Sequence, residues 1–241
     1  MRLFLPALLC LIAMAQPAFA ATAPDRVLIF TKTAGFRHES IPVAVQTLQR
    51  LATEAGMVAD HSEDAALFTP EQLSRYRVIV FASTTGEVLD ATQQRAMEDY
   101  VRHGGGFVGV HAAADTGYEW PWYGRLVGAY FRGHPPGLQS SRVQPERDGK
   151  PAGASWPVHD ELYNYRGNPR GQVEVLATLD ESLYEGGTMG TDHPIAWCHR
   201  YDGGRAWYTG LGHDEAIYDQ PEFLAQLRRG LAYAAGRSDE G

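Results

Sequence analysis

His111 is the residue of this sequence at which chemistry is easiest to place. It follows residues 104–110, in which three glycines precede a short apolar run, and it is followed by three alanines. Glycines suit the end of a helix, and the apolar run suits a strand buried on both faces. The pattern predicts a helix, a strand and a sharp turn that presents an imidazole at the carboxyl end of the strand, where open α/β sheets bind their ligands.

An imidazole at such a turn can act as a general acid or base, or it can ligate a metal ion. In α/β-hydrolases and class I glutamine amidotransferases the same position carries a serine or cysteine nucleophile. Here His111 occupies it, and Cys198 lies in a predicted hairpin strand, where a small buried thiol is the expected role. We therefore do not expect glutaminase or thiol-hydrolase chemistry.

Five further histidines fall in predicted loops or at strand ends, accompanied by charged residues. If three or more histidines met at the carboxyl edge of one sheet, they would form a metal site or a site of proton transfer. None has the spacing of a known metal motif such as His-Glu-x-x-His, so the sequence requires no cofactor, although it leaves a divalent metal open. These histidines are His38, His134, His159, His193 and His213, and the charged residues are Arg37, Asp115, Glu161, Asp192 and Asp214.

The first twenty residues have the features of a cleaved signal peptide. Arg2 precedes an apolar run over residues 3–15, and the run ends in Ala18-Phe19-Ala20, a small-x-small pattern that signal peptidase reads. The run is short for a bilayer span, which needs roughly 20 apolar residues. We expect cleavage after Ala20, a mature protein in the periplasm or outside the cell, and no stable membrane association.

The remaining residues, 21–241, have the composition of a single globular domain without internal repeats or low-complexity linkers. Removal of Arg2 leaves 20 Lys and Arg against 29 Asp and Glu, a net charge of -9. This acidic balance, with no cluster of basic residues, argues against nucleic acid or an anionic membrane as a partner. Cys10 is removed with the signal peptide, so Cys198 has no partner for an internal disulfide.

Strands and helices alternate through the first half of the chain, which implies a parallel sheet with helices on both faces. After the turn at His111 a helix is expected to run to about Phe131, and the stretch 158–163 is not assigned to an element. Two alternating runs around Asp202-Gly203 predict a hairpin, and Pro221 begins a last helix. The strands predicted for the first half are 26–31, 57–61, 78–83 and 107–110.

Several short motifs together resemble the ThuA-like family, which is named for trehalose utilisation and is related in fold to class I glutamine amidotransferases. The resemblance implies an α/β fold, a flavodoxin-like three-layer sandwich with a mostly parallel central sheet and a C-terminal hairpin. It also implies that His111 replaces the glutaminase cysteine. The motifs cover nearly all of the mature chain and are residues 36–41, 105–111, 113–116, 131–135, 160–163, 192–194 and 204–213.

The resemblance further implies a role in disaccharide catabolism, on sugars oxidised to the 3-keto form by partner dehydrogenases. A keto group acidifies the neighbouring C–H, so a well-placed base could isomerise such a sugar, or expel its glycosidic oxygen by elimination or hydrolysis. A non-catalytic sugar-binding protein and a metal-assisted hydrolase are the alternatives. The predicted catalytic residues are His111, as the base, with His38 and His213, and the predicted substrate-binding residues are Arg37, Asp115, His134, Glu161, Asp192 and His193.

Overall fold

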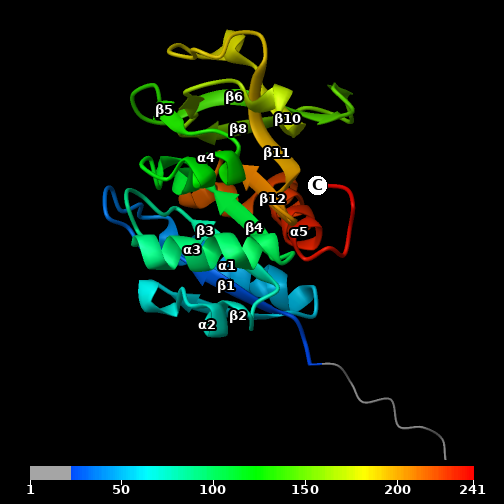
Figure 1. Ribbon diagram of the computed structural model, residues 1–241. Helices are drawn as coiled ribbons and strands as arrows, with labels where there is room; N and C mark the ends of the chain where they lie inside the picture. Colours follow the sequence, from blue (N-terminus) through cyan, green and yellow to red (C-terminus); the bar gives the residue numbers. More distant parts are fainter. Residues whose placement is uncertain (1–22) are drawn as a thin grey trace, which may run out of the picture.

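The computed structural model describes residues 23–241, so the predicted signal peptide, residues 1–20, lies outside the described residues. Ten strands form one sheet through the centre of the molecule (Figure 1). These strands are β1 (Arg26–Phe30), β2 (Val58–Ser62), β3 (Val78–Ala82), β4 (Gly106–Val110), β6 (Gln139–Arg147), β7 (Lys150–Pro151), β8 (Trp156–Asp160), β10 (Glu174–Leu179), β11 (His193–Tyr201) and β12 (Gly204–Thr209). A separate short pair consists of β5 (Phe131–Gly133) and β9 (Asn164–Tyr165).

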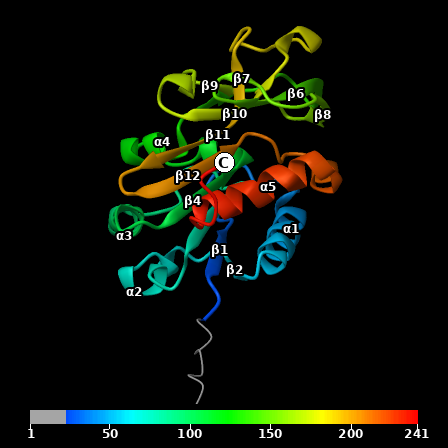
Figure 2. The same ribbon diagram turned by 90° about the vertical axis from the view of Figure 1, so that its right-hand side faces the viewer.

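Half of the sheet is parallel, in the order β2-β1-β3-β4-β12. Every residue of β3 and β4 is buried, as their continuous apolar runs predict. Figure 2 shows helices on both faces of this half, with α1 and α5 on one side and α2, α3 and α4 on the other. The predicted α/β layering is therefore confirmed for this half. The helices are α1 (Ile41–Glu54), α2 (Pro70–Leu73), α3 (Ala91–Arg102), α4 (Pro121–Val127) and α5 (Pro221–Ala234).

The prediction of a mostly parallel sheet is wrong for the molecule as a whole. Beyond β12 the sheet continues through β11, β10 and β6, and each of these strands is antiparallel to its neighbour. β8 also pairs with β6, and its last three residues are the first three of the stretch 158–163 that the sequence left unassigned. The sheet is mixed because the described chain has no α-helix between β6 and β12 to form the crossover that parallel neighbours need, and β11 and β12 are joined by a two-residue turn, which joins antiparallel neighbours.

The predicted hairpin at Asp202-Gly203 is confirmed as β11 and β12. Asp202 has a φ of 47° and Gly203 a φ of 97°, the two positive values that the favoured two-residue turn requires. A Cβ on Gly203 would lie 2.4 Å from the carbonyl oxygen of Arg102, so the turn needs glycine for space as well. The hairpin matters for function because β12 carries the chain back beside β4, the strand that ends at His111.

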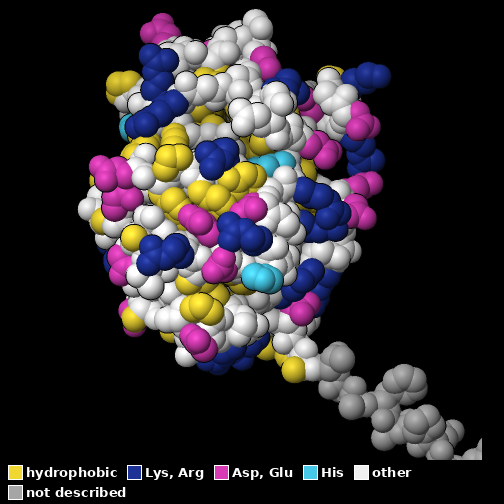
Figure 3. Space-filling model, in the orientation of Figure 1, with side chains coloured by type: hydrophobic (Ala, Val, Ile, Leu, Met, Phe, Trp, Pro, Cys, Tyr) yellow, Lys and Arg dark blue, Asp and Glu magenta, His cyan; other side chains and the backbone are white. Residues whose placement is uncertain are grey.

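The helix expected to run to Phe131 ends earlier, at Val127, where Gly128 takes a φ of 96°. No helix in the described part of the chain has both the length and the apolarity to cross a membrane. On the face drawn in Figure 3, basic and acidic side chains are interspersed, and apolar side chains gather near its centre.

Candidate functional site

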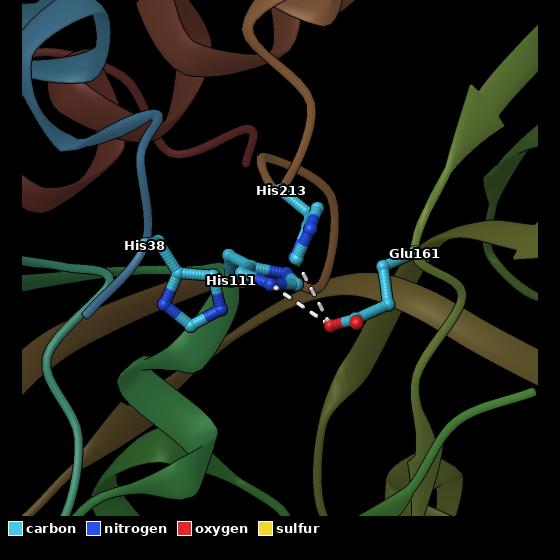
Figure 4. Close-up of side chains that lie close together, drawn as sticks. All are labelled: His38, His111, Glu161 and His213. Atoms are coloured by element: carbon cyan, nitrogen blue, oxygen red, sulfur yellow. Dashed lines mark ion pairs between the residues drawn. The ribbon is translucent and has the colours of Figure 1, made fainter. Parts of the chain in front are cut away.

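Four loops bring their polar side chains together at one edge of the sheet. His38 follows β1, His111 follows β4 and His213 follows β12, and these parallel strands end at the same edge. Glu161 comes directly after β8, from the antiparallel half. Figure 4 shows the three imidazoles and the carboxylate pointing toward one another. We call His38, His111, Glu161 and His213 the histidine cluster.

The backbone at His111 makes the predicted sharp turn. His111 has a φ of 52°, a left-handed conformation that is uncommon for residues other than glycine. The turn is fixed from β12 and from the residue that follows it, because the Tyr208 hydroxyl donates to the His111 carbonyl at 2.9 Å and His111 Nδ1 lies 2.9 Å from the Gly210 carbonyl oxygen. Backbone strain held in place by such contacts is typical of functional sites.

Glu161 is the centre of the histidine cluster. Its Oε2 lies 3.5 Å from His111 Nε2 and 3.2 Å from His213 Nδ1. Its Oε1 lies 3.2 Å from Nε2 of His134, a fifth residue at the rim. One ligand atom from each of the four cluster residues falls within 4.8 Å of the others. The cluster is therefore compact enough for its members to share one proton or one ion.

Burial divides the histidines of the cluster and its rim into an inner and an outer group. The side chain of His111 is fully buried and the residue His38 is 5% exposed, whereas the side chains of His213 and His134 are 28% and 35% exposed. Burial, reinforced by the neighbouring imidazoles His111 and His213, lowers the pKa of His38 to about 3. A substrate could therefore reach the outer histidines, while the inner ones lie behind them.

The charges within the cluster favour an ionised Glu161. Burial acts to raise the pKa of Glu161, but its contacts with His111 and His213 outweigh burial and hold the pKa far below its ordinary value. The Glu161 contact in turn raises the pKa of His213, against the opposing effect of burial. The site is thus a buried, ionised carboxylate surrounded by imidazole nitrogens, and it favours a positive charge on one of these nitrogens.

Three buried nitrogens of the cluster have no hydrogen-bond partner within the described chain. They are His38 Nδ1, His111 Nε2 and His213 Nδ1. His111 and His213 approach Glu161 only as ion-pair contacts, at 3.5 and 3.2 Å. Buried polar atoms in folded proteins are nearly always paired, so three orphans at one point call for an explanation. A site prepared for a ligand provides one.

A family model described as ThuA, trehalose utilisation, matches residues 26–234, which is most of the chain. This chain belongs to the ThuA family. The description of the family agrees with the carbohydrate-related role that the sequence suggested. No curated protein matches the chain.

Solved structures agree with the ThuA assignment. A ThuA-like protein from Bacteroides uniformis is 25% identical, with a TM-score of 0.72 over 90% of this chain and 96% of that chain. Another from Parabacteroides merdae is 22% identical, with a TM-score of 0.72 over 90% and 91%. A β-galactosidase from Rahnella is 16% identical, with a TM-score of 0.55 over 87% of this chain and 31% of that chain, and shares the fold alone.

In this ThuA-family protein, five of the nine predicted site residues meet at the cluster or its rim: His38, His111, His134, Glu161 and His213. Asp115 lies close by in sequence to His111, and the Tyr118 hydroxyl donates to its Oδ1 at 2.5 Å. Burial raises the pKa of Asp115, partly opposed by this hydrogen bond and by the charge of His111.

The other three predicted residues are engaged elsewhere. Arg37 is exposed and pairs with Glu63 at 2.7 Å. Asp192 accepts hydrogen bonds from Arg170, and the two form a surface ion pair. His193 is fully buried and bonded at both ring nitrogens. We leave these three out of the proposed site, because ion pairs and packing already occupy their polar groups.

Asp160 lies in the motif 160–163, but no feature of the sequence assigned it to the site, and in the structure it holds the backbone of the cluster. This fully buried carboxylate accepts hydrogen bonds from the backbone N–H groups of Gly212 and Asp214, at 2.7 and 2.8 Å, on either side of His213. Its Oδ1 also accepts from the N–H of Glu161 at 3.0 Å. Asp160 therefore ties the loop of His213 to Glu161, a link that is visible only in the tertiary structure.

Two aromatic side chains beside the cluster were also missed as site residues. The Tyr163 ring packs on His111, with ring centroids 4.2 Å apart. Phe36 lies 4.8 Å from His38 between ring centroids, and it is 64% exposed, more than any other large apolar residue of the described chain. Phe36 begins the motif 36–41, but only its exposure beside the cluster in the structure indicates that it could contact a ligand.

Cys198 and the larger cavities lie away from the cluster. Cys198 is a buried free thiol in β11, and burial raises its pKa to about 12. It lines a surface cavity of about 650 Å³ together with Arg170 and Glu174. This cavity shares no residue with the histidine cluster. The cluster reaches solvent at His213 and at the neighbouring rim residue His134, whose side chains are partly exposed.

Proposed function

We propose that this ThuA-family protein acts on oxidised (3-keto) sugars or glycosides, and that the reaction is a proton transfer next to the keto group. The observation that carries the proposal is the convergence of three histidines and one carboxylate at the carboxyl edge of the sheet, in a family described by trehalose utilisation. Proton transfer needs groups of this kind, held within hydrogen-bond reach of the substrate.

Phe36 supports a sugar as the ligand. Exposed aromatic rings beside a polar site offer an apolar face, and the C–H face of a sugar ring can stack on it. Phe36 adjoins His38 and is 64% exposed, so a sugar stacked there would lie next to the cluster.

The division into inner and outer histidines suggests which residue transfers the proton. We assign this step to His134, because it is at the rim and partly exposed, and its Nε2 lies 3.2 Å from Glu161 Oε1. His134 Nδ1 lies 2.8 Å from the carbonyl oxygen of Pro135, which fixes the orientation of the ring. His111 was predicted to be the base, but its complete burial favours a role behind the substrate, together with His38.

The chemical step follows from the 3-keto group. His134 removes the proton on the carbon next to the carbonyl, and the electron pair of that C–H bond moves onto the carbonyl oxygen as an enediolate. Within the histidine cluster, His213 is the group best suited to stabilise this oxyanion, because its pKa is raised by Glu161 and its side chain is 28% exposed. Isomerisation follows when the proton returns to the former carbonyl carbon and the neighbouring hydroxyl passes its proton to the former carbonyl oxygen, so that a new carbonyl forms on the neighbouring carbon. Departure of the glycosidic oxygen with the abstracted proton instead completes an elimination and leaves a carbon–carbon double bond.

The test is exchange of the sugar proton with solvent. Protein incubated with 3-keto-trehalose in D2O should place deuterium on the carbon next to the keto group, which NMR detects whether or not the reaction goes on to isomerisation or elimination. In His134→Asn the exchange rate should fall by about 10² to 10⁴. The matched control is His159→Asn, which removes an exposed histidine on β8 that is bonded to Ser140 and lies outside the cluster.

Binding of the keto-sugar without any exchange would reject the enzyme and favour the sugar-binding alternative. Equal loss of exchange in both variants would reject the role of His134. Phe36→Ala adds an independent check, because loss of a stacking surface should weaken binding of the sugar by about 1 kcal/mol and leave the exchange rate of bound sugar nearly unchanged.

We also propose that the protein works in the periplasm or outside the cell after removal of residues 1–20. The support is the basic start, apolar run and Ala18-Phe19-Ala20 pattern of the sequence. Mass spectrometry of the protein from its native cells should find Ala21 at the N-terminus. An intact Met1 would reject cleavage.

A further inference from the structure

We propose that His38, His111, His213 and Glu161 together bind one divalent transition-metal ion. This inference goes beyond the proposed function, which needs a positively charged group behind the keto oxygen but does not say what that group is. The metal site is argued from the geometry of the free protein and can be tested without any sugar.

The spacing of the cluster fits a metal. Four ligands at about 2.1 Å from a tetrahedral ion lie about 3.4 Å from one another. Glu161 Oε2 lies 3.5 Å from His111 Nε2 and 3.2 Å from His213 Nδ1, so both nitrogens already lie at about that separation from the carboxylate oxygen. The whole set spans no more than 4.8 Å, so small side-chain movements would complete the coordination.

The hydrogen bonding of His111 leaves a lone pair in front of its ring that a metal ion can use. A carbonyl oxygen only accepts, so the contact between His111 Nδ1 and the Gly210 carbonyl places a hydrogen on Nδ1. The neutral ring then has its lone pair on Nε2, which faces the ionised oxygen of Glu161. Two electron pairs facing each other across a buried gap repel, and a metal ion between them removes the repulsion. Metal-ligating histidines usually have this kind of carbonyl partner on the other nitrogen.

The second oxygen of Glu161 is held by a residue outside the proposed ligand set. Oε1 contacts His134 Nε2 at 3.2 Å, which leaves Oε2 as the oxygen directed at the imidazoles. Asp160 adds support by fixing the backbone on both sides of His213 and at Glu161. Ligands oriented by outer hydrogen bonds are a usual feature of metal sites.

The donor set selects the class of metal. Three imidazole nitrogens and one carboxylate suit zinc, iron, cobalt, nickel or manganese, whereas calcium and magnesium prefer oxygen ligands alone. A metal held here would be the Lewis acid that stabilises the developing oxyanion of the keto-sugar. The metal would also give a partner to two of the orphaned nitrogens, His111 Nε2 and His213 Nδ1, which both face Glu161 Oε2.

The experiment is metal binding by untagged protein that has been stripped with a chelator and dialysed. Titration with Zn²⁺ followed by calorimetry should give one site per chain with a dissociation constant below about 1 μM. Co²⁺ should give visible absorption bands of the intensity typical of four or five ligands, a signature that weak surface binding would not produce.

Two ligand variants and two controls locate the site. Glu161→Gln and His213→Ala should each weaken Zn²⁺ binding at least 100-fold, and His213 is partly exposed in a loop, so its variant should keep the fold and the melting temperature should confirm this. His134→Asn, which removes only the outer contact, should weaken binding by about 10- to 100-fold at most. His159→Asn should leave binding unchanged.

Absence of Zn²⁺, Co²⁺ and Mn²⁺ binding by the wild-type protein would overturn the proposal. So would binding that persists in both folded ligand variants. Neither result depends on a sugar, so the exchange test of the proposed function can succeed where the metal site fails, and the reverse.

Discussion

Two buried histidines of this protein face a glutamate, and they differ in what fits between the two groups. His193 Nε2 lies 2.8 Å from the carbonyl oxygen of Tyr163, and its Nδ1 lies 2.7 Å from Glu181 Oε1. His111 has the same arrangement, a carbonyl at one nitrogen and Glu161 at the other, but its distance to the carboxylate is 3.5 Å.

The shorter distance holds a single proton. At 2.7 Å the contact between His193 Nδ1 and Glu181 Oε1 is short enough for one shared proton, which would belong to the pair rather than to either residue. Burial lowers the pKa of His193, while its contacts with Tyr163 and Glu181 act in the opposite direction. Tyr184 adds its hydroxyl 3.1 Å from the same Nδ1. Every polar atom of this group has a partner, which is the mark of a structural role.

The longer distance leaves room that a second and a third imidazole share. His213 approaches the same oxygen of Glu161, and His38 lies against both rings, 4.7 Å from His111 and 5.1 Å from His213 between centroids. Composition and burial alone do not separate a functional histidine from a structural one. The gathering of three nitrogens without a partner at one point distinguishes this site, because elsewhere in the described chain such nitrogens occur singly, as at His199 Nδ1.

Among the variants that compare the two buried histidines, the largest effect should come from His111→Asn. Loss of one group that stabilises the oxyanion should slow deuterium exchange into 3-keto-trehalose by about 10² to 10³. The fold should survive within about 1.5 kcal/mol, because Asn tolerates the positive φ and its amide can donate to the Gly210 carbonyl. The melting temperature and the exchange rate are measured together. A variant that melts much earlier but exchanges normally would make His111 a structural histidine like His193.

His193→Asn should show the opposite pattern. The change leaves Glu181 or the Tyr163 carbonyl without its buried partner, at a cost of about 2–4 kcal/mol in the free energy of unfolding. Chemical denaturation measures this loss, and the exchange rate per folded molecule should stay within a few-fold of wild type. If exchange collapses while stability holds, the division between the two histidines is wrong.

Asp160→Asn should have a mixed and smaller effect. The amide keeps one acceptor but turns an N–H toward a backbone N–H of Gly212 or Asp214, so we expect a loss of about 1–2 kcal/mol in stability. The loop of His213 would then be less well placed, and exchange should slow about tenfold, since misplacement of a supporting group reduces catalysis. Unchanged exchange in a destabilised variant would limit Asp160 to a structural role.

Tyr184→Phe should have the smallest effect. It removes one of two contacts at His193 Nδ1 and leaves the bond to Glu181, so stability should fall by about 0.5–1 kcal/mol. Exchange should not change, because Tyr184 touches only the structural pair. Thermal unfolding is sufficient to measure this difference, with wild type and His193→Asn as the two references.

The parallel half of the fold could be read from the sequence because its signals are local. Continuous apolar runs give β1, β3 and β4, and Asp202-Gly203 gives the turn between β11 and β12. β8 could not be read, since it is short, its last buried position is the charged Asp160, and its partner β6 is fixed only by long-range pairing.

The same limit applies to the site. The sequence by itself determined that His38, His111 and His213 follow strands, and parallel strands must end at one edge, so their approach to one another was predictable. Only the tertiary structure decided that Glu161 from β8 enters between them, while His193 is sealed beside Glu181. The reason is that the difference between a contact of 2.7 Å and one of 3.5 Å depends on how the two halves of the sheet pack. A one-dimensional pattern of residue types does not contain that information.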